Sequence, residues 1–195
     1  MEVSTQFPSL DIIIGAMYSG KTTEIMRRLN IFQEMGYKCL YINSILDTRN
    51  EEVLSTHNPS LKVSKTRVDM IKYNVLPTNI ESISEYDVIG IDEAQFIPNL
   101  KDSVLKYVEE FGKKVIIGGL NGDFQRNKFG EVIDLIPYCD QIIKLQPFCL
   151  PCSKKDRKMV PALFSKRIVH DSNTQQILIG SLEAYVPACR KCYLE

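Results

Sequence analysis

The sequence has no excess of charge of either sign. Its 24 Lys and Arg residues balance 24 Asp and Glu residues, so the formal net charge is zero. A neutral chain lacks the electrostatic attraction that draws proteins to nucleic acids or membrane surfaces. Residues 154–158 carry four basic side chains interrupted by one acid, a pattern more typical of an exposed loop than of a phosphate site. We therefore expect no nucleic-acid partner and no membrane partner.

Long apolar runs are also missing. No stretch approaches the ~18 residues that a membrane-spanning helix needs, and the first nine residues lack the hydrophobic core of a signal peptide. We expect a cytoplasmic protein in a reducing compartment. Its six cysteines then indicate metal binding or buried thiols rather than disulfides. The two histidines, His57 and His170, are isolated, and we assign them no chemistry.

A phosphate-binding motif stands near the start of the chain. Residues 15–22 read G-A-M-Y-S-G-K-T, which matches G-x-x-x-x-G-K-[ST]. An apolar run at 10–14 precedes the motif and an amphipathic helical pattern follows it, as a strand–loop–helix phosphate site requires. Lys21 is expected to reach the β- and γ-phosphates, and the Thr22 hydroxyl to ligate Mg²⁺. The alternative, a glycine turn that only caps a helix, does not account for these flanks.

Further apolar runs alternate with helical segments. Strands are expected at 37–43, 88–91, 114–119 and 141–145, with a helix at 98–111 that starts near Asn99 and ends at Gly112. This alternation predicts an α/β fold, a P-loop NTPase-like parallel sheet with helices on both faces. The pattern fades between 44 and 78. There we expect a surface loop that could serve as a lid, a short strand near 61–65 and a helical turn near 68–73.

Two acids follow the strand expected at 88–91. Ligands of open parallel sheets lie beyond the carboxyl ends of the strands, so Asp92 and Glu93 are expected in the same crevice as the phosphate loop. Asp92 suits a Mg²⁺ site, and Glu93 could accept a proton from an attacking hydroxyl. Arg49 could stabilise charge on a transferring phosphoryl group, although the sequence alone favours an exposed loop charge.

Two cysteine pairs define the C-terminal part of the chain. Cys149 and Cys152 form one C-x-x-C pair, and Cys189 and Cys192 form the other. Four thiolates at this spacing predict a closed, structural Zn²⁺ site, with redox chemistry the weaker alternative. We expect two domains, a P-loop α/β kinase domain at 1–146 and a small zinc-binding subdomain at 147–195.

The combination resembles the zinc-containing (type II) thymidine kinases of cells and large DNA viruses. The resemblance extends from about residue 10 to 193 and rests on separated blocks. These blocks read I-I-I-G-A-M-Y-S-G-K-T-T-E-I-M-R-R, Y-K-C-L-Y-I, L-D-T-R, V-I-G-I-D-E-A-Q-F, G-L-N-G-D-F-Q-R-N-K-F-G, F-S-K-R, I-G-S-L-E-A-Y and C-R-K-C-Y. Departures from the family pattern are mild. They include Ser165 in place of a threonine and Gln176 in place of an aliphatic residue.

The resemblance implies transfer of the γ-phosphoryl of ATP to the 5′-hydroxyl of thymidine, and of deoxyuridine as well, in nucleotide salvage. It implies ATP, Mg²⁺ and structural Zn²⁺ as cofactors, Glu93 as general base and Arg49 as phosphate clamp. The residues it implies at ATP or its phosphates are Gly15, Ala16, Met17, Tyr18, Ser19, Gly20, Lys21, Thr22, Asp92 and Gln95. Those it implies at the nucleoside are Met17, Leu120, Phe124, Phe129, Ser165, Gln176, Ile177, Leu178 and Tyr185. The segment at 152–189 matches a lasso loop over the base, and the family implies a homotetramer, or else a dimer.

Two other classes of protein share some of these features. A zinc-ribbon ATPase that binds nucleic acid would also combine a P-loop with cysteine pairs, but it would need a basic surface. A P-loop module that binds without turnover would have little use for Glu93 beside Asp92. A phosphoryl-transfer assay with several nucleosides distinguishes the three.

Overall fold

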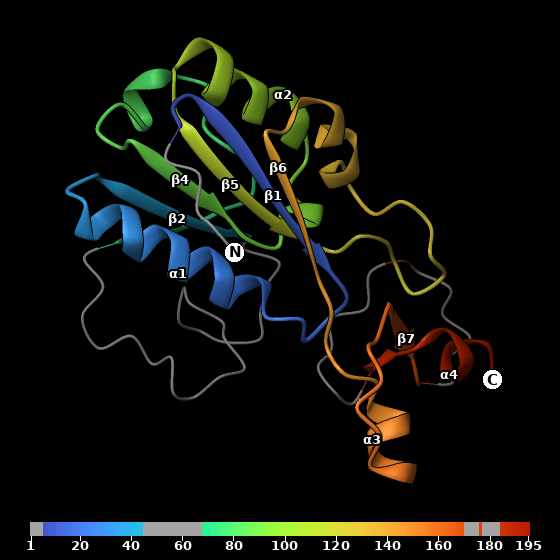
Figure 1. The fold of residues 1–195 in the computed structure, drawn as a ribbon. Helices are drawn as coiled ribbons and strands as arrows, with labels where there is room; N and C mark the ends of the chain where they lie inside the picture. The colour runs from blue at the N-terminus through green and yellow to red at the C-terminus, as the bar shows by residue number, and fades with distance from the viewer. Residues whose placement is uncertain (1–5, 45–67, 170–175, 177–183) are drawn as a thin grey trace.

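The computed structural model describes residues 6–44, 68–169, 176 and 184–195. Its centre is one parallel sheet with the strand order β3-β2-β4-β5-β1-β6 (Figure 1). The strands are β1 (Ser9–Gly15), β2 (Cys39–Ser44), β3 (Asp69–Tyr73), β4 (Val88–Ile91), β5 (Lys114–Gly119) and β6 (Gln141–Leu145). All five neighbouring pairs are parallel. The predicted α/β fold class is therefore confirmed.

Helices cover both faces of the sheet. α1 (Lys21–Glu34) lies on one face, and α2 (Leu100–Leu105) lies on the other, continued by the π-helical turn η4 (Lys106–Glu110) (Figure 1). The helix expected at 98–111 is thus present. Asn99 is its N-cap residue, but its side chain accepts no capping hydrogen bond, and Gly112 follows its end with a left-handed φ of 66°. Short 3₁₀ helices lie between the strands of this sheet in the sequence: η2 (Ile80–Ser82), η3 (Ala94–Phe96) and η5 (Val132–Tyr138).

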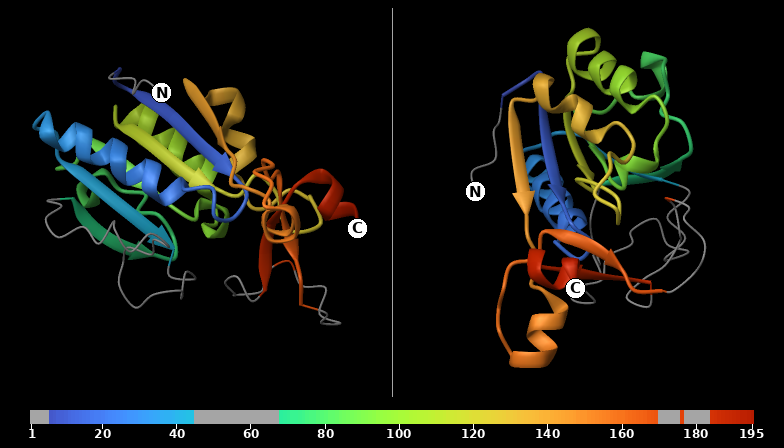
Figure 2. Two further views of the ribbon diagram at one scale, coloured as in Figure 1. Left: turned by 60° about the horizontal axis from the view of Figure 1, so that its bottom comes forward. Right: turned by 90° about the vertical axis from the view of Figure 1, so that its right-hand side faces the viewer.

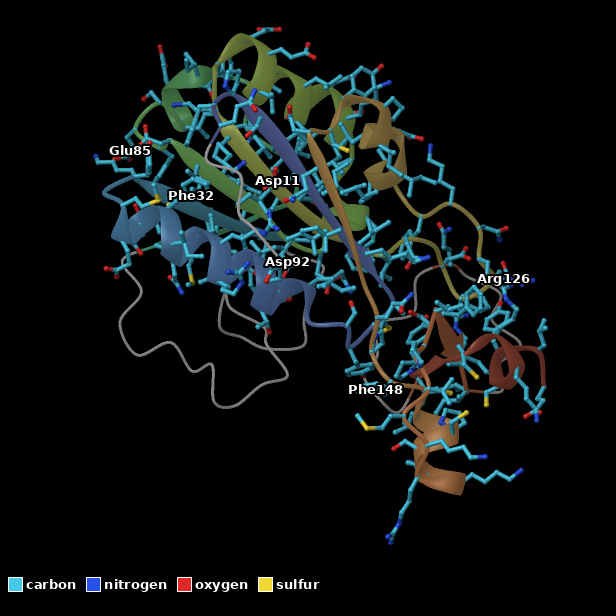
Figure 3. The ribbon with its side chains drawn as sticks, in the orientation of Figure 1. Asp11, Phe32, Glu85, Asp92, Arg126 and Phe148 are labelled. Carbon is cyan, nitrogen blue, oxygen red and sulfur yellow. The ribbon has the colours of Figure 1, made fainter. Side chains whose placement is uncertain are left out.

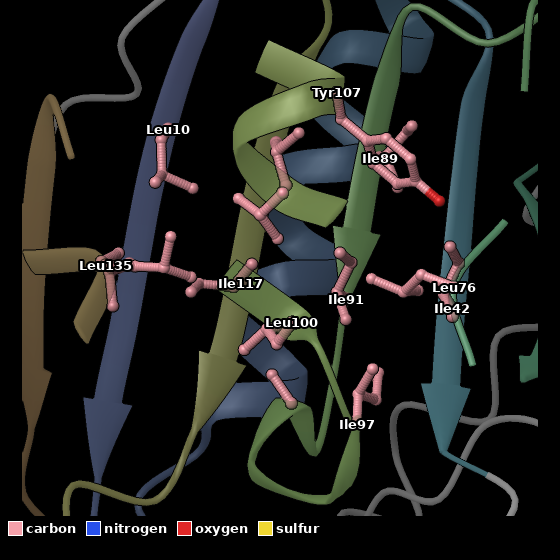
Figure 4. Close-up of a cluster of buried hydrophobic side chains, with 14 of the residues drawn as sticks. Leu10, Ile42, Leu76, Ile89, Ile91, Ile97, Leu100, Tyr107, Ile117 and Leu135 are labelled. Atoms are coloured by element: carbon pink, nitrogen blue, oxygen red, sulfur yellow. The ribbon is translucent and has the colours of Figure 1, made fainter. Parts of the chain in front are cut away.

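The alternation of side chains along β1 divides the core into two layers. Leu10, Ile12 and Ile14 face the layer that contains α2, whereas Ile13 faces α1. Figure 4 shows the larger layer, in which apolar side chains of the central strands meet those of α2. Because β1 is buried along its whole length, both of its faces must be apolar or internally paired.

Asp11 is the charged residue of β1 and is labelled in Figure 3. Its carboxylate accepts hydrogen bonds from Arg28 of α1 at 2.6 Å and from Lys114 of β5 at 3.3 Å, and all three side chains are fully buried. Lys114 also donates to the Ser9 hydroxyl. Burial lowers the pKa of Lys114, while the carboxylate of Asp11 opposes this shift. The network joins α1 to two central strands.

The remaining described residues form a small C-terminal unit beyond the carboxyl ends of the strands (Figures 1 and 2). It contains α3 (Leu150–Asp156), the antiparallel pair β7 (Phe164–Arg167) and β8 (Tyr185–Ala188), and α4 (Arg190–Leu194). Its position at this edge brings it next to the phosphate loop.

One expectation is wrong. Residues 68–73 were expected to form a helical turn, but Asp69–Tyr73 form the edge strand β3. An edge strand has one neighbour and is only partly buried, so its sequence D-M-I-K-Y retains polar residues that obscure the strand pattern. The strand expected at 61–65 and most of the 44–78 loop lie outside the described residues. None of the described helices is long and apolar enough to cross a membrane.

Candidate active site

The phosphate loop connects β1 to α1 in a conformation that glycine makes possible. Gly20, the N-cap residue of α1, has a φ of 85°, and Tyr18 also has a left-handed φ of 65°. Gly15 is closely surrounded, since a Cβ there would lie 2.4 Å from the Leu145 carbonyl oxygen. The buried ammonium of Lys21 donates to the Ala16 carbonyl at 3.0 Å. The loop thus has the backbone shape and the cation of an anion-binding site.

Asp92 joins the end of β4 to the start of α1. One carboxylate oxygen accepts hydrogen bonds from the Thr22 hydroxyl at 2.5 Å and from the Tyr41 hydroxyl at 2.9 Å. Burial raises the pKa of Asp92, and the neighbouring charge of Glu93 raises it further, whereas these hydrogen bonds lower it. The structure therefore brings together the two residues that the sequence assigned to Mg²⁺. Their oxygens are hard ligands of the kind that this ion takes.

Glu93 is buried and lies at the same edge of the sheet. Its φ of 47° is left-handed, which is uncommon for a residue with a side chain and costs of order 1 kcal/mol. Its carboxylate accepts a 2.5 Å hydrogen bond from the side-chain N–H of Gln95. The side-chain oxygen of Gln95 accepts a hydrogen bond from the Leu120 backbone N–H at 3.1 Å. Both ends of the Gln95 amide are thus used inside the protein. The Gln95 side chain therefore connects the candidate base Glu93 to Leu120, which follows β5 and is the first candidate nucleoside residue of the 120–130 loop.

The phosphate loop also contacts the C-terminal unit directly. The backbone N–H of Met17 donates to the hydroxyl of Ser165 in β7 at 3.0 Å. Both residues were assigned to the nucleoside, although they are 148 positions apart in the chain. Phe129, another residue of that set, is buried and packs edge-on against Phe96 with ring centroids 5.4 Å apart.

Phe124 and Tyr185 are connected by an arginine that the sequence analysis did not single out. The Arg167 guanidinium lies over the Phe124 ring at 3.7 Å and donates to the Tyr185 hydroxyl at 2.6 Å and 3.2 Å. Only its place in the F-S-K-R block, two residues after Ser165, could have indicated it.

The loop at 120–130 is organised by a single carboxylate. Asp123 accepts backbone hydrogen bonds from Gln125 and Asn127 through one oxygen. Its other oxygen accepts a 2.8 Å bond from the side chain of Gln176, which also donates to the Lys128 carbonyl at 3.0 Å. The Gln176 side chain therefore contacts this loop. Its backbone was predicted to contact the base edge.

The four cysteines assigned to zinc form one cluster. All four sulfur atoms lie within 4.8 Å of one another, and Cys152 Sγ is 3.8 Å from Cys189 Sγ and 3.5 Å from Cys192 Sγ. A tetrahedral Zn²⁺ with bonds of about 2.3 Å separates its sulfur ligands by about 3.8 Å. The donor set and its spacing therefore suit zinc.

Three residues of the predicted site lie outside the described part of the chain. They are Arg49, Ile177 and Leu178. The structure does bring together the phosphate loop, the two acids and the nucleoside candidates from both parts of the chain at one edge of the sheet.

Comparison with known proteins decides the family. The model of a family described as "Thymidine kinase" matches residues 8–193. The chain belongs to the thymidine kinase family. The poxvirus members are similar over nearly their whole length. The thymidine kinase of variola virus is 37% identical over 186 residues, covering 95% of this chain and 97% of the relative. That of vaccinia virus is 36% identical with the same coverage, and that of Choristoneura fumiferana entomopoxvirus is 38% identical over 191 residues, 96% of this chain and 97% of the relative.

Family membership makes this chain a phosphotransferase and agrees with the resemblance inferred from the motifs. A solved structure of the flagellar accessory protein FlaH from Methanocaldococcus jannaschii aligns with 71% of each chain at 17% identity and a TM-score of 0.43. A likeness at that level carries no argument about function.

Proposed function

We propose that this thymidine kinase family member transfers the γ-phosphoryl group of ATP to the 5′-hydroxyl of thymidine, and of deoxyuridine, in nucleotide salvage. The observation that carries the proposal is the meeting of Thr22, Asp92 and Glu93 at one edge of the sheet. Thr22 belongs to the phosphate loop, and its hydroxyl is bonded to Asp92, the residue next to Glu93. A phosphate site and a candidate base are thereby adjacent, as direct phosphoryl transfer needs.

The phosphate loop holds the nucleotide in this proposal. Backbone N–H groups of residues 15–22 bind the phosphates, and the Lys21 ammonium moves from the Ala16 carbonyl to the β- and γ-phosphates. Thr22 and Asp92 would hold Mg²⁺, which when bound offsets the negative charge of the phosphates. Gln95 was assigned to the nucleotide too, but its contacts support a different role, the orientation of Glu93.

Glu93 acts as the general base. Its carboxylate takes the proton of the 5′-hydroxyl as the oxygen attacks the γ-phosphorus. The bond between the γ-phosphorus and the bridging oxygen breaks in the same step, and ADP leaves with that oxygen. The bond from Gln95 and the constrained backbone support this role because they hold the carboxylate in one position. We propose that Arg49, outside the described residues, stabilises the charge on the transferring group.

The nucleoside pocket is assigned to the 120–130 loop and the C-terminal unit. Met17, Leu120, Phe124 and Phe129 supply apolar walls for one flat ring, which a purine would overfill. Ser165, Tyr185 and the backbone at 176–178 supply polar contacts to thymidine. Cytosine presents an amino donor in place of the O4 acceptor and lacks the N3 proton. Two buried hydrogen bonds would then be mismatched, which predicts about 100-fold discrimination or more.

The same proposal assigns one structural Zn²⁺ to Cys149, Cys152, Cys189 and Cys192, and it divides the chain into domains at 1–146 and 147–195. It also includes a cytoplasmic location, no nucleic-acid or membrane partner, and a homotetramer, or else a dimer, in solution. The spacing of the four sulfur atoms supports the zinc site. Size-exclusion chromatography with light scattering tests the oligomeric state.

A transfer assay with γ-labelled ATP tests the reaction. We expect label on thymidine and deoxyuridine, and kcat/KM at least about 100-fold lower for deoxycytidine and for deoxyguanosine. Comparable values for thymidine and deoxyguanosine would contradict the pocket assignment. ATP hydrolysis that needs single-stranded nucleic acid would favour the rival ATPase.

A further inference from the structure

We propose that Arg167 is a positioning residue of the nucleoside pocket, which fixes the ring of Phe124 and turns the Tyr185 hydroxyl into a hydrogen-bond donor toward the bound nucleoside. The inference rests on the proposed function, because it takes Phe124 and Tyr185 as pocket residues. It adds a residue that the motifs did not assign.

The placement of Arg167 follows from strand geometry. Arg167 is the last residue of β7, and its cross-strand partner in β8 is Tyr185. Side chains alternate along a strand, so Arg167 lies on the same face of β7 as Ser165, whose hydroxyl bonds the phosphate loop. Lys166 faces the other way and donates to the Cys192 carbonyl at 2.7 Å. One face of β7 therefore serves the site and the other supports the cysteine cluster.

The guanidinium holds two aromatic rings from different parts of the chain. Its central carbon is 3.7 Å from the Phe124 ring centroid and 5.3 Å from that of Tyr185. A planar cation over an aromatic face restricts the tilt of the ring. The Phe124 backbone is held separately, since its carbonyl accepts a 2.6 Å bond from the Tyr193 hydroxyl. Phe124 is thus constrained at both its ring and its carbonyl.

The bonds to Tyr185 determine which way its hydroxyl donates. Both Nη2 and Nε of Arg167 point at this oxygen, at 2.6 Å and 3.2 Å. An arginine only donates, and a phenol oxygen carries one hydrogen of its own. With its acceptor positions taken by the guanidinium, that hydrogen must be directed at another acceptor. A nucleoside offers such acceptors in its sugar hydroxyls and base carbonyls. Tyr185 is buried, so few water molecules compete for the bond.

Steady-state kinetics of R167M and R167K test the inference. R167M removes the positive charge and the planar guanidinium with its two hydrogen bonds to Tyr185. R167K keeps a positive charge but cannot both stack on Phe124 and donate two hydrogen bonds to Tyr185. For R167M we expect KM for thymidine to rise about 10- to 100-fold, the usual effect of losing a hydrogen bond to a charged group. KM for ATP changes less than about twofold because the phosphate loop is untouched. We expect the thymidine KM of R167K to lie between those of R167M and the unmodified chain.

A matched control lies on the opposite face of the hairpin. Arg190 also places its guanidinium over an aromatic ring, that of Phe164, at 5.1 Å. R190M removes a comparable contact in the same unit, and we expect thymidine KM to stay within about twofold of its original value. Thermal unfolding of every variant shows whether a change in KM follows a loss of stability.

A double-mutant cycle tests the role of the tyrosine hydroxyl. If Arg167 acts through it, R167M raises thymidine KM less in the Y185F background than in the unmodified chain. Unchanged thymidine KM in R167M, equal rises for thymidine and ATP, or the same rise in R190M would each overturn the inference. The proposed function would survive those outcomes, and it fails instead if the unmodified chain does not phosphorylate thymidine.

Discussion

Glu93 combines three properties that rarely meet in one residue. It is buried, its backbone is left-handed, and its carboxylate is held by Gln95. Backbone strain of this kind persists only where surrounding contacts enforce it, and it concentrates at functional sites. We infer that the surrounding contacts hold the Glu93 carboxylate in a fixed position in spite of the conformational strain of its backbone.

Replacing Glu93 by Gln removes the proton acceptor and keeps the shape. We expect kcat to fall about 10²- to 10⁴-fold, the usual contribution of a general base, with little change in ATP affinity. Rapid-quench assays and ATP titration measure the two quantities. E85Q is the control, because Glu85 is exposed and pairs only with Lys38 among the contacts described. Near-normal turnover by E93Q would contradict the assignment.

At the scale of elements, the 120–130 loop depends on a close approach between two backbones. Gly130 has a φ of 61°, and a Cβ there would lie 2.4 Å from the backbone carbonyl oxygen of Gln95. Gly112 has a similar φ of 66° but has open space around its Cβ position. Substituting alanine at each of these two glycines therefore separates the free-energy cost of the left-handed conformation from the cost of the steric clash.

We expect G112A to lower the free energy of unfolding by about 1–2 kcal/mol, the cost of the left-handed conformation alone. G130A costs more, and it also raises KM for thymidine because the clash displaces Gln95 and the loop it supports. Urea unfolding and steady-state kinetics test the comparison. Equal destabilisation of both variants, with unchanged kinetics, would show that the contact at Gly130 is unimportant.

The strands that the sequence predicted are those with continuous apolar runs between turn residues. Runs at 88–91, 114–119 and 141–145 became β4, β5 and β6 without change in their bounds. The edge strand β3 was missed because its exposed side permits polar residues. Sequence spacing places Glu93 and Lys21 at one edge of the sheet, since parallel strands share their carboxyl ends. It does not reveal Arg167, whose partners come from loops and strands distant in the chain.

At the scale of the whole molecule, the buried charges around Asp11 join α1 to the central strands β1 and β5. D11N would leave the buried Lys114 without a carboxylate partner and would leave Arg28 with Glu24, at 2.9 Å, as its remaining carboxylate among the contacts described. Loss of one partner in a buried ion pair costs about 3–5 kcal/mol, so we expect D11N to lower the free energy of unfolding by this amount. Urea denaturation measures it, and an effect below about 1 kcal/mol, typical of exposed pairs, would contradict the prediction. K38M, which breaks the exposed pair with Glu85, is the comparison.

We expect the cysteine cluster to stabilise the 120–130 loop as well as the C-terminal unit. Tyr193 follows Cys192 in α4 and donates to the Phe124 carbonyl, so loss of zinc is expected to release one side of the 120–130 loop. We expect C192S to lose zinc, to melt at a lower temperature and to bind thymidine more weakly. Metal analysis, thermal unfolding and calorimetry measure these effects. Y193F keeps all four cysteines and should lose thymidine affinity without losing zinc; unchanged thymidine binding in both variants would contradict the coupling.

The hydrogen bond from Met17 to Ser165 joins the loop that we assign to the nucleotide to the strand that we assign to the nucleoside pocket. Each half of the site therefore contributes one of the two atoms of the same bond. Any occupant of the phosphate loop that favours this bond also favours the arrangement that receives the nucleoside. Thermodynamic reciprocity then requires that the factor by which ATP changes thymidine affinity equal the factor by which thymidine changes ATP affinity. A nucleotide that strengthens this one bond thereby makes the two substrates of this kinase effectors of each other.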